Sequence, residues 1–216
     1  MTQAVLAMKV KKTNSFVSVY ISFVYFNMKM KNQSIFTFAL WLKGVKRFMR
    51  YAVLYQSKSG NTKLLAEEIF NSIDSDEKVI CDIDECDEIP AVDVYFVGFG
   101  IHNYSCSIDI ANCMENIGVS KLALFATCGY MPTEQYKEKL EDNLEVWLPE
   151  TAEYLGMYLC QGKVEFDRRE IMISKMPQAE NKMREMFNQG CTHPDDEDLE
   201  AVSNFAKRVQ RMVENN

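Results

Sequence analysis

The chain has 216 residues, of which 47% are hydrophobic, and it carries a formal net charge of −7. This length fits one globular domain with an appendage better than two domains. The acidic balance argues against nucleic-acid binding, which requires a basic surface, and favours docking to a basic partner.

The charge is distributed unevenly along the chain. Residues 1–48 contain eight Lys or Arg residues and no Asp or Glu, so the remaining 168 residues carry 16 basic and 31 acidic side chains. A discontinuity this sharp marks two segments of different character. We therefore divide the chain into a basic N-terminal extension, residues 1–48, and a domain, residues 49–216.

The extension contains two apolar runs, 16–26 and 35–42. Neither approaches the roughly 20 residues needed to cross a bilayer, and no A-x-A-type cleavage site follows the first run, as a signal peptide requires. Three interpretations stay open: a non-native extension from a start codon assigned too early, an interfacial membrane-attaching segment, and a genuine signal or structural element. We favour the first, and we expect membrane attachment only if residues 1–48 are native.

Short apolar runs alternate with amphipathic segments from residue 51 onward. Aromatic and branched residues predict strands at five of these runs, which are 51–56, 78–81, 92–98, 121–127 and 155–160. Apolar residues at helical spacing predict helices at 63–73, 108–117, 133–147 and near 178–187, and a final helix beginning around Pro194. Strands that alternate with helices predict an α/β fold with a doubly wound parallel sheet and helices on both faces.

Ligands of doubly wound sheets bind where strands end, near the topological switch point, so three loops are candidates. The first loop leaves the first predicted strand and consists of Ser57, Lys58, Ser59, Gly60, Asn61 and Thr62. Its hydroxyls and backbone N–H groups are suited to one phosphate at the positive end of a helix, and Gly60 lets the backbone approach closely. The loop is neither a Walker A loop nor a G-x-G-x-x-G fingerprint. We therefore favour a single phosphate monoester over an ordinary polar turn.

The second and third loops carry residues suited to a flat ring. The second loop, 98–107, contains His102, Asn103 and Tyr104, and Tyr104 either lies against a ring or packs on the end of the sheet. The third loop contains Thr127, Cys128, Gly129 and Tyr130. Backbone groups of this third loop are expected to reach the polar edge of the ring, with Tyr130 covering it.

The final helix has the clearest boundary signals. Thr192 or His193 is expected to cap it, with Pro194 in its first turn, and four acidic residues follow at its positive end. Its apolar stripe is expected to consist of Leu199, Val202, Phe205, Val209 and Met212.

Seven cysteines lie in the domain, at 81, 86, 106, 113, 128, 160 and 191, and no C-x-x-C pair occurs. Their odd number and scatter are typical of a protein in a reducing cytosol rather than of a disulfide framework. We therefore expect a cytoplasmic protein, and we assign no metal site. A redox role for Cys128 is a minor alternative, because no partner cysteine is evident from the sequence.

These motifs resemble the flavodoxin family. SKSGNT is similar to the family's T/S-x-T/S-G-x-T phosphate loop, DVYFVGFG resembles its third strand, and KLALFATCGY resembles its fourth strand with the loop that follows. The blocks CQGK (160–163) and HP-x-x-x-DLE (193–200) are similar to those of a group of flavodoxin-like proteins from anaerobic bacteria. The resemblance covers residues 49–213.

The resemblance implies a five-stranded flavodoxin-like sheet, with strand order 2-1-3-4-5, that binds FMN non-covalently. The first loop would take the phosphate, and residues 100–106 and 127–130 would hold the isoalloxazine ring. In this group a Trp often follows the Gly-Phe pair of the second loop, and here that position is Gly100. Ring stacking would then fall to His102, Tyr104 or Tyr130, and His102 is a minor candidate for a proton donor to the flavin.

Three functions follow from the resemblance. The favoured one is an electron carrier, without catalytic residues of its own, that serves a partner reductase containing flavin or iron–sulfur clusters, such as one acting on tetrapyrroles. The alternatives are an oxidoreductase acting directly on a quinone, NAD(P)H or a porphyrinogen, and a non-redox binding module that has lost the flavin. The acidic segment 82–88 is expected either to steer a basic partner or to be a solvated surface.

Overall fold

The computed structural model describes residues 49–215, and all structural statements below refer to this part of the chain. The interpretations of residues 1–48 lie outside the described residues. Within 49–215, no helix combines the length and the apolar character that a membrane crossing requires.

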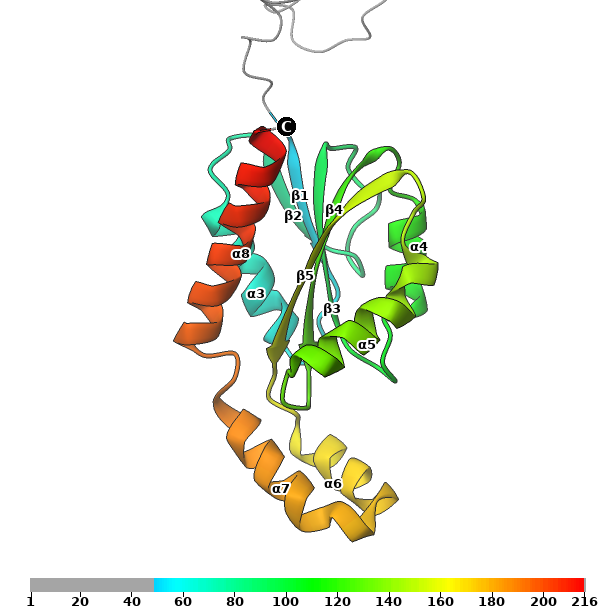
Figure 1. The fold of residues 1–216 in the computed structure, drawn as a ribbon, viewed down its shortest axis with the longest axis vertical. Coiled ribbons are helices and arrows are strands. Elements are labelled where there is room, and N and C mark those ends of the chain that lie inside the picture. Colours follow the sequence, from blue (N-terminus) through cyan, green and yellow to red (C-terminus); the bar gives the residue numbers. More distant parts are fainter. Residues whose placement is uncertain (1–48, 216) are drawn as a thin grey trace, which may run out of the picture. The chain divides into compact units, whose positions relative to one another are not determined.

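A five-stranded parallel sheet forms the centre of the fold, in the order β2-β1-β3-β4-β5 (Figure 1). The strands are β1 (Tyr51–Tyr55), β2 (Lys78–Asp82), β3 (Val94–Gly100), β4 (Ser120–Cys128) and β5 (Ala152–Gln161). The doubly wound sheet and its strand order are therefore confirmed. The chain runs outward from β1 to β2 and then returns past β1 to β3, which places the topological switch point between β1 and β3.

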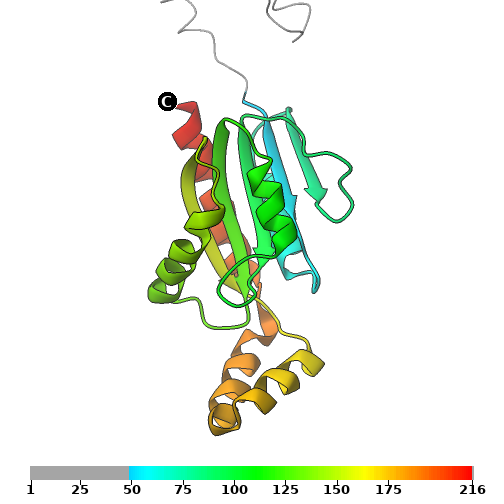
Figure 2. The ribbon, with the colours of Figure 1, turned by 90° about the vertical axis from the view of Figure 1, so that its right-hand side faces the viewer.

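Two pairs of helices cover the sheet, one pair on each face (Figures 1 and 2). Helices α3 (Asn61–Ser72) and α8 (Asp196–Glu214) pack on one face, and α4 (Ile108–Glu115) and α5 (Glu134–Leu144) on the other. Strands β3 and β4 are apolar and almost wholly buried because they are covered on both faces. The predicted helix at 133–147 is α5 followed by a 3₁₀ turn, η1 (Glu145–Trp147).

The connection from β2 to β3, residues 83–93, contains no helix. Parallel neighbours are usually joined by a helical crossover that covers the sheet. Here an acidic loop takes that place, and its apolar side chains, Ile83, Ile89 and Val92, pack against the core on the α4 side. This part of the sheet therefore has a thinner cover than the rest.

A helical hairpin lies between β5 and α8 and extends past the edge where the strands end (Figures 1 and 2). It consists of α6 (Phe166–Lys175) and α7 (Glu180–Gln189), linked by a short 3₁₀ turn, η2 (Pro177–Ala179). Its small core contains Ile173, Met183 and Phe187. Helix α7 was predicted near 178–187, whereas α6 was not predicted. Helix α6 escaped detection because Phe166 and Ile171 are exposed, so its apolar residues do not mark one buried face.

The start and the stripe of α8 differ from their predictions. The cap is Asp195, not Thr192 or His193, and Pro194 lies before the helix rather than in its first turn. Asp195 accepts from the backbone N–H groups of Glu197 and Asp198, and Asp198 accepts in return from the Asp195 N–H, which is a capping box. Met212 is 42% exposed, and Val213 takes its place in the core.

Strand β3 also differs from its prediction, since it begins at Val94 and extends to Gly100 rather than ending at 98. The extension forms because Phe99 and Gly100 pair with Ala126 and Thr127 of β4. The first residues assigned to the second loop are therefore strand residues, and the loop itself begins at Ile101.

His193 forms a titratable pair with Asp198 in the first turn of α8. Its Nδ1 lies 2.5 Å from Asp198 Oδ2, and this hydrogen bond raises the pKa of His193 above 6.5. A group with a raised folded-state pKa contributes stability below its unfolded pKa and loses that contribution as the pH rises through the folded pKa.

We therefore expect the free energy of unfolding to fall as the pH rises from 6.5 through the raised folded-state pKa of His193. Because the pair is partly exposed, the contribution is about 1 kcal/mol or less. Urea unfolding of the full chain at several pH values measures it, and His193→Gln is expected to flatten the dependence. An equally steep dependence in the variant would contradict this role for His193.

Candidate functional site

The first loop ends at a helix whose N-cap residue supplies no side-chain cap. Helix α3 begins after Gly60, which has no side chain to cap it, and its first turn contains no acidic residue. Helices α4, α5 and α8, by contrast, each begin with a side-chain cap. The first N–H groups of a helix have no acceptor within it, and they carry its positive dipole end. The start of α3 is therefore suited to an anion.

Gly60 shapes this helix start. Its φ is +86°, a conformation that side chains rarely tolerate, and a Cβ added there would meet nothing within 4 Å. The backbone around Gly60 is thus open to a ligand. The neighbouring Lys58 and Ser59 are exposed.

Hydrogen bonds within the first loop, and from it to β5, hold its side chains. Ser57 Oγ accepts from the backbone N–H of Lys63 at 3.2 Å. Asn61 Nδ2 donates to Ser59 Oγ at 3.1 Å and to the carbonyl of Lys163 at 2.9 Å. A Cβ at Gly162 would lie 2.6 Å from Asn61 Nδ2, so this contact requires glycine there. The first loop is therefore anchored to the chain that follows β5.

A buried hydrogen bond joins the first and third loops. The hydroxyl oxygens of Thr62 and Thr127 lie 2.9 Å apart, and these residues are 2% and 6% exposed. Both had been assigned to the candidate site from sequence, and the structure brings them together. The bond fixes the start of α3 relative to the end of β4.

The second loop contains a tight turn. The backbone N–H groups of His102 and Ser105 each donate to the other's carbonyl at 3.0 Å, and the two residues between them have positive φ, 51° at Asn103 and 58° at Tyr104. This is the type I′ pattern, which Asn tolerates well and Tyr does not. All three predicted residues, His102, Asn103 and Tyr104, are exposed on this turn.

Three tyrosine rings gather beside the turn. The centroids of Tyr104 and Tyr136 lie 5.1 Å apart, and those of Tyr130 and Tyr136 lie 6.4 Å apart. Lys139 Nζ lies 4.3 Å from the Tyr104 centroid, and Asn143 Nδ2 donates to the Tyr104 carbonyl at 3.2 Å. The second and third loops thus meet through α5.

Helix α5 contributes residues to this site that were not predicted from the sequence. Its residues Tyr136, Lys139 and Asn143 follow one another at spacings of three and four, which places them on one helix face. Thr133 caps the helix by accepting from the backbone N–H of Tyr136. The spacing was visible in the sequence, but the side of the helix that faces the loops was not.

Cys128 and Gly129 lie inside the third loop. The Cys128 thiol donates to the carbonyls of Tyr130, at 3.1 Å, and Cys160, at 3.5 Å, and burial raises its pKa to about 12. The thiolate is the reactive form of cysteine, so this environment disfavours a redox role for Cys128. A Cβ at Gly129 would lie 2.7 Å from Val164, which keeps the loop close to the chain after β5.

One further cluster has the spacing of metal ligands within residues 49–215, namely His193, Asp195 and Asp198. The side chains of both Asp195 and Asp198 accept backbone N–H groups in the capping box of α8, and Asp198 also binds His193. The start of the helix accounts for the cluster, and we assign no metal to it.

Comparison with known proteins places these features in a family. A family model described as "Flavodoxin domain" matches residues 52–207. The "Flavodoxin-like domain-containing protein BilS" of Clostridioides difficile (strain CD3) is 30% identical over 170 residues, covering 74% of this chain and 96% of the relative. The protein of the same name from Clostridium symbiosum (strain WAL-14163) is 25% identical over 180 residues, covering 73% and 94%. A solved flavodoxin from the domain Archaea is 17% identical, with a TM-score of 0.45, covering 76% of this chain and 99% of that one.

The Thr62–Thr127 bond makes a prediction about stability. Thr62→Val or Thr127→Val alone leaves one buried hydroxyl without its partner, and we expect each to lower the free energy of unfolding by about 1–2 kcal/mol. The double variant removes both hydroxyls and is expected to lose little more than either single variant. Urea unfolding of the four proteins measures the coupling between the two residues. Strictly additive losses would show that the bond contributes nothing.

Proposed function

The chain belongs to the flavodoxin family, and we propose that it binds FMN non-covalently and carries electrons to a partner reductase. The start of α3, where Gly60 supplies no side-chain cap and the first turn has no acidic residue, is the observation that carries the proposal. It lies where β1 ends, beside the switch point at which doubly wound sheets bind their ligands.

The first loop fits the phosphate of FMN. It offers the open backbone at Gly60, the N–H groups of the first turn of α3, and the hydroxyls of Ser57 and Ser59. It has no acidic side chain that would repel a phosphate. The loop provides for one phosphate only, which suits a mononucleotide better than a dinucleotide.

The second and third loops are the proposed holders of the isoalloxazine ring. Tyr104 and Tyr130 are its candidate covers, with His102 and Asn103 on the adjoining turn, and Tyr136 supports both covers through its ring contacts. Backbone groups of Thr127 and Gly129 would meet the polar edge of the ring. FMN itself supplies the redox chemistry, and the protein holds it and tunes its electronics.

The proposed partner is a flavin or iron–sulfur reductase that acts on a tetrapyrrole. The support is the resemblance of the blocks CQGK and HP-x-x-x-DLE to those of flavodoxin-like proteins from anaerobic bacteria, which implies such a partner. Two curated relatives that carry the name BilS come from Clostridioides difficile and Clostridium symbiosum. We place the carrier in the cytoplasm, where seven unpaired cysteines would stay reduced.

FMN binding is tested with the full chain and two ligands, FMN and riboflavin, which lacks the phosphate. We expect FMN to bind at least tenfold more tightly, measured by quenching of flavin fluorescence. Ser59→Asp places a negative charge in the first loop. We expect it to lower the affinity for FMN at least tenfold and to leave the affinity for riboflavin unchanged. The matched control, Asn71→Asp, adds the same charge in the last turn of α3. Equal affinity of the wild-type chain for FMN and riboflavin would refute the assigned phosphate site.

Electron transfer is tested by titrating the FMN-loaded chain with dithionite while its visible spectrum is recorded. Reduction in two separated one-electron steps is expected of the carrier. A single two-electron step would favour a direct oxidoreductase, whose turnover with NAD(P)H and quinones would be measured next. Failure of the folded chain to bind FMN would leave the non-redox binding module.

Gly100 supplies a second test of the ring site. A Cβ there would meet only Thr127 Oγ1, at 3.9 Å, so the immediate surroundings do not require glycine. If this position faces the ring, Gly100→Trp adds a stacking surface, and we expect FMN to bind about two- to tenfold more tightly. Fluorescence titration measures the change, and Gly118→Trp, at an open position after α4, is the control. The same gain in both variants would remove Gly100 from the ring site.

A further inference from the structure

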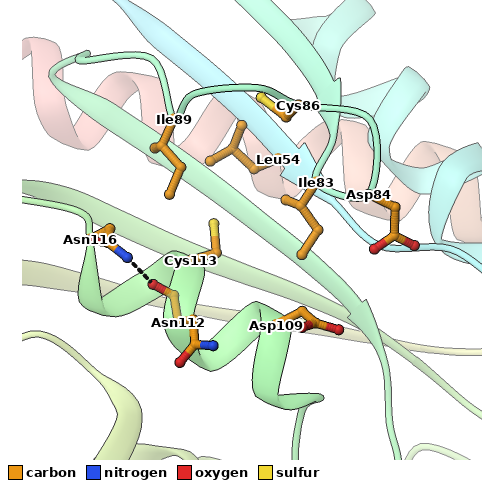
Figure 3. Close-up of a pocket in the computed structure, with 9 residues that line it drawn as sticks. All are labelled: Leu54, Ile83, Asp84, Cys86, Ile89, Asp109, Asn112, Cys113 and Asn116. Carbon is orange, nitrogen blue, oxygen red and sulfur yellow. Dashed lines mark hydrogen bonds between the residues drawn. The ribbon is translucent and has the colours of Figure 1, made fainter.

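A pocket lies where the crossover helix between β2 and β3 is missing. Its volume is about 390 Å³, and it separates the acidic loop after β2 from helix α4 (Figure 3). We name it the loop pocket, and it is lined by Leu54, Ile83, Asp84, Cys86, Ile89, Asp109, Asn112, Cys113 and Asn116. It shares no lining residue with the loops assigned to FMN.

The inner wall of the loop pocket is apolar. Leu54 of β1 is fully buried at its base, and Ile83 and Ile89 reach in from the acidic loop (Figure 3). These side chains can pack against a hydrocarbon group but offer no hydrogen bond. The pocket therefore suits an occupant with an apolar stem.

Two carboxylates lie at one end of the loop pocket, Asp84 from the acidic loop and Asp109 from α4 (Figure 3). Both accept from the same neutral group, Gln56 Nε2, at 2.7 and 3.4 Å. Gln56 is only 9% exposed, and its Oε1 accepts from the Ser107 hydroxyl at 2.7 Å, which fixes its orientation. The amide thus holds the two carboxylates in place.

Within the described part of the chain, no cationic side chain forms an ion pair with either of these carboxylates. Within residues 49–215, the ion pairs of the structure involve other carboxylates, and neither Asp84 nor Asp109 has a Lys, Arg or His partner within 4.0 Å. The two negative charges face a partly apolar pocket, where a single sign of charge focuses the field.

The chain around the loop pocket is also negatively charged. Residues 79–120 contain no Lys or Arg. They contain eight carboxylates, which are Asp82, Asp84, Glu85, Asp87, Glu88, Asp93, Asp109 and Glu115. This stretch includes the second loop, 98–107, so the acidic region adjoins the proposed ring site.

We infer that the loop pocket receives an arginine side chain of the basic partner protein. The aliphatic stem would pack on Leu54, Ile83 and Ile89, and the guanidinium would lie between Asp84 and Asp109, whose oxygens can accept from several of its N–H groups. The inference rests on the proposed docking of a basic partner at this acidic surface, and it assigns that docking a specific anchor.

The probe is Nα-acetyl-arginine methylamide, titrated into the ¹⁵N-labelled full chain and followed by NMR. The matched probe is the citrulline analogue, which has nearly the same shape but a neutral urea in place of the guanidinium. We expect the arginine probe to bind weakly and saturably and to shift the side-chain amide signals of Asn112, Asn116 and Gln56. The citrulline probe is expected to bind at least tenfold more weakly. Added salt is expected to lower the affinity for the arginine probe, because it screens the charges.

Two variants test the carboxylates. The double variant Asp84→Asn with Asp109→Asn keeps acceptors for Gln56 and removes both charges. We expect it to lower the affinity for the arginine probe about tenfold. The control, Asp196→Asn with Glu200→Gln, removes two exposed charges from the first turns of α8. We expect it to leave the affinity for the arginine probe unchanged.

The inference is overturned by equal binding of the two probes, by unchanged binding in the Asp84/Asp109 variant, or by absence of saturable shifts at the pocket. FMN affinity is measured on the same samples, so the two proposals can fail separately. A chain that binds FMN but not the arginine probe would overturn the arginine anchor alone. A chain that binds the arginine probe but not FMN would overturn the proposed electron carrier alone.

Discussion

The position of β1 between β2 and β3 is the constraint on which the rest of the fold depends. Parallel pairing on both sides aligns Tyr55 with Asp82 of β2 and with Gly98 of β3, so neighbouring strands end at nearly the same level. The pairing of Gly100 with Thr127 continues this alignment to β4. All the candidate binding loops therefore leave one edge of the sheet, although they are far apart in the sequence.

Much of this arrangement could be predicted from local sequence. A buried strand in a parallel sheet needs a short apolar run, and each of the five runs became a strand within three residues at either end. Helix α3 was found from its apolar spacing. The failures lie where tertiary contacts decide the outcome. Asp195 rather than Thr192 caps α8, because Asp195 and Asp198 form a reciprocal capping box. Helix α6 is stabilised by its packing on α7 and has no clear apolar face of its own.

The candidate site shows the same division. The sequence could indicate which loops carry phosphate-binding and aromatic residues, because those residues follow strands. It could not show that Thr62 and Thr127 would bond to each other, since 65 residues separate them. Nor could it show that Tyr136 and Lys139 would reach the second loop, because that depends on the orientation of α5. Local patterns identify the parts of a site, whereas contacts between parts depend on the folded chain.

The block CQGK lies where the chain after β5 meets three other segments of the fold. Gly162 N–H donates to the Cys128 carbonyl at 2.8 Å, and Lys163 N–H donates to the His193 carbonyl at 2.8 Å. The Lys163 carbonyl accepts from Asn61 at 2.9 Å. Gly162 and Lys163 thus connect the third loop, the segment before α8 and the first loop. The hairpin of α6 and α7 begins shortly after this junction, which contacts the first loop through Asn61. The loop pocket, by contrast, is linked to the second loop by the hydrogen bonds of Gln56 with Asp84 and Ser107.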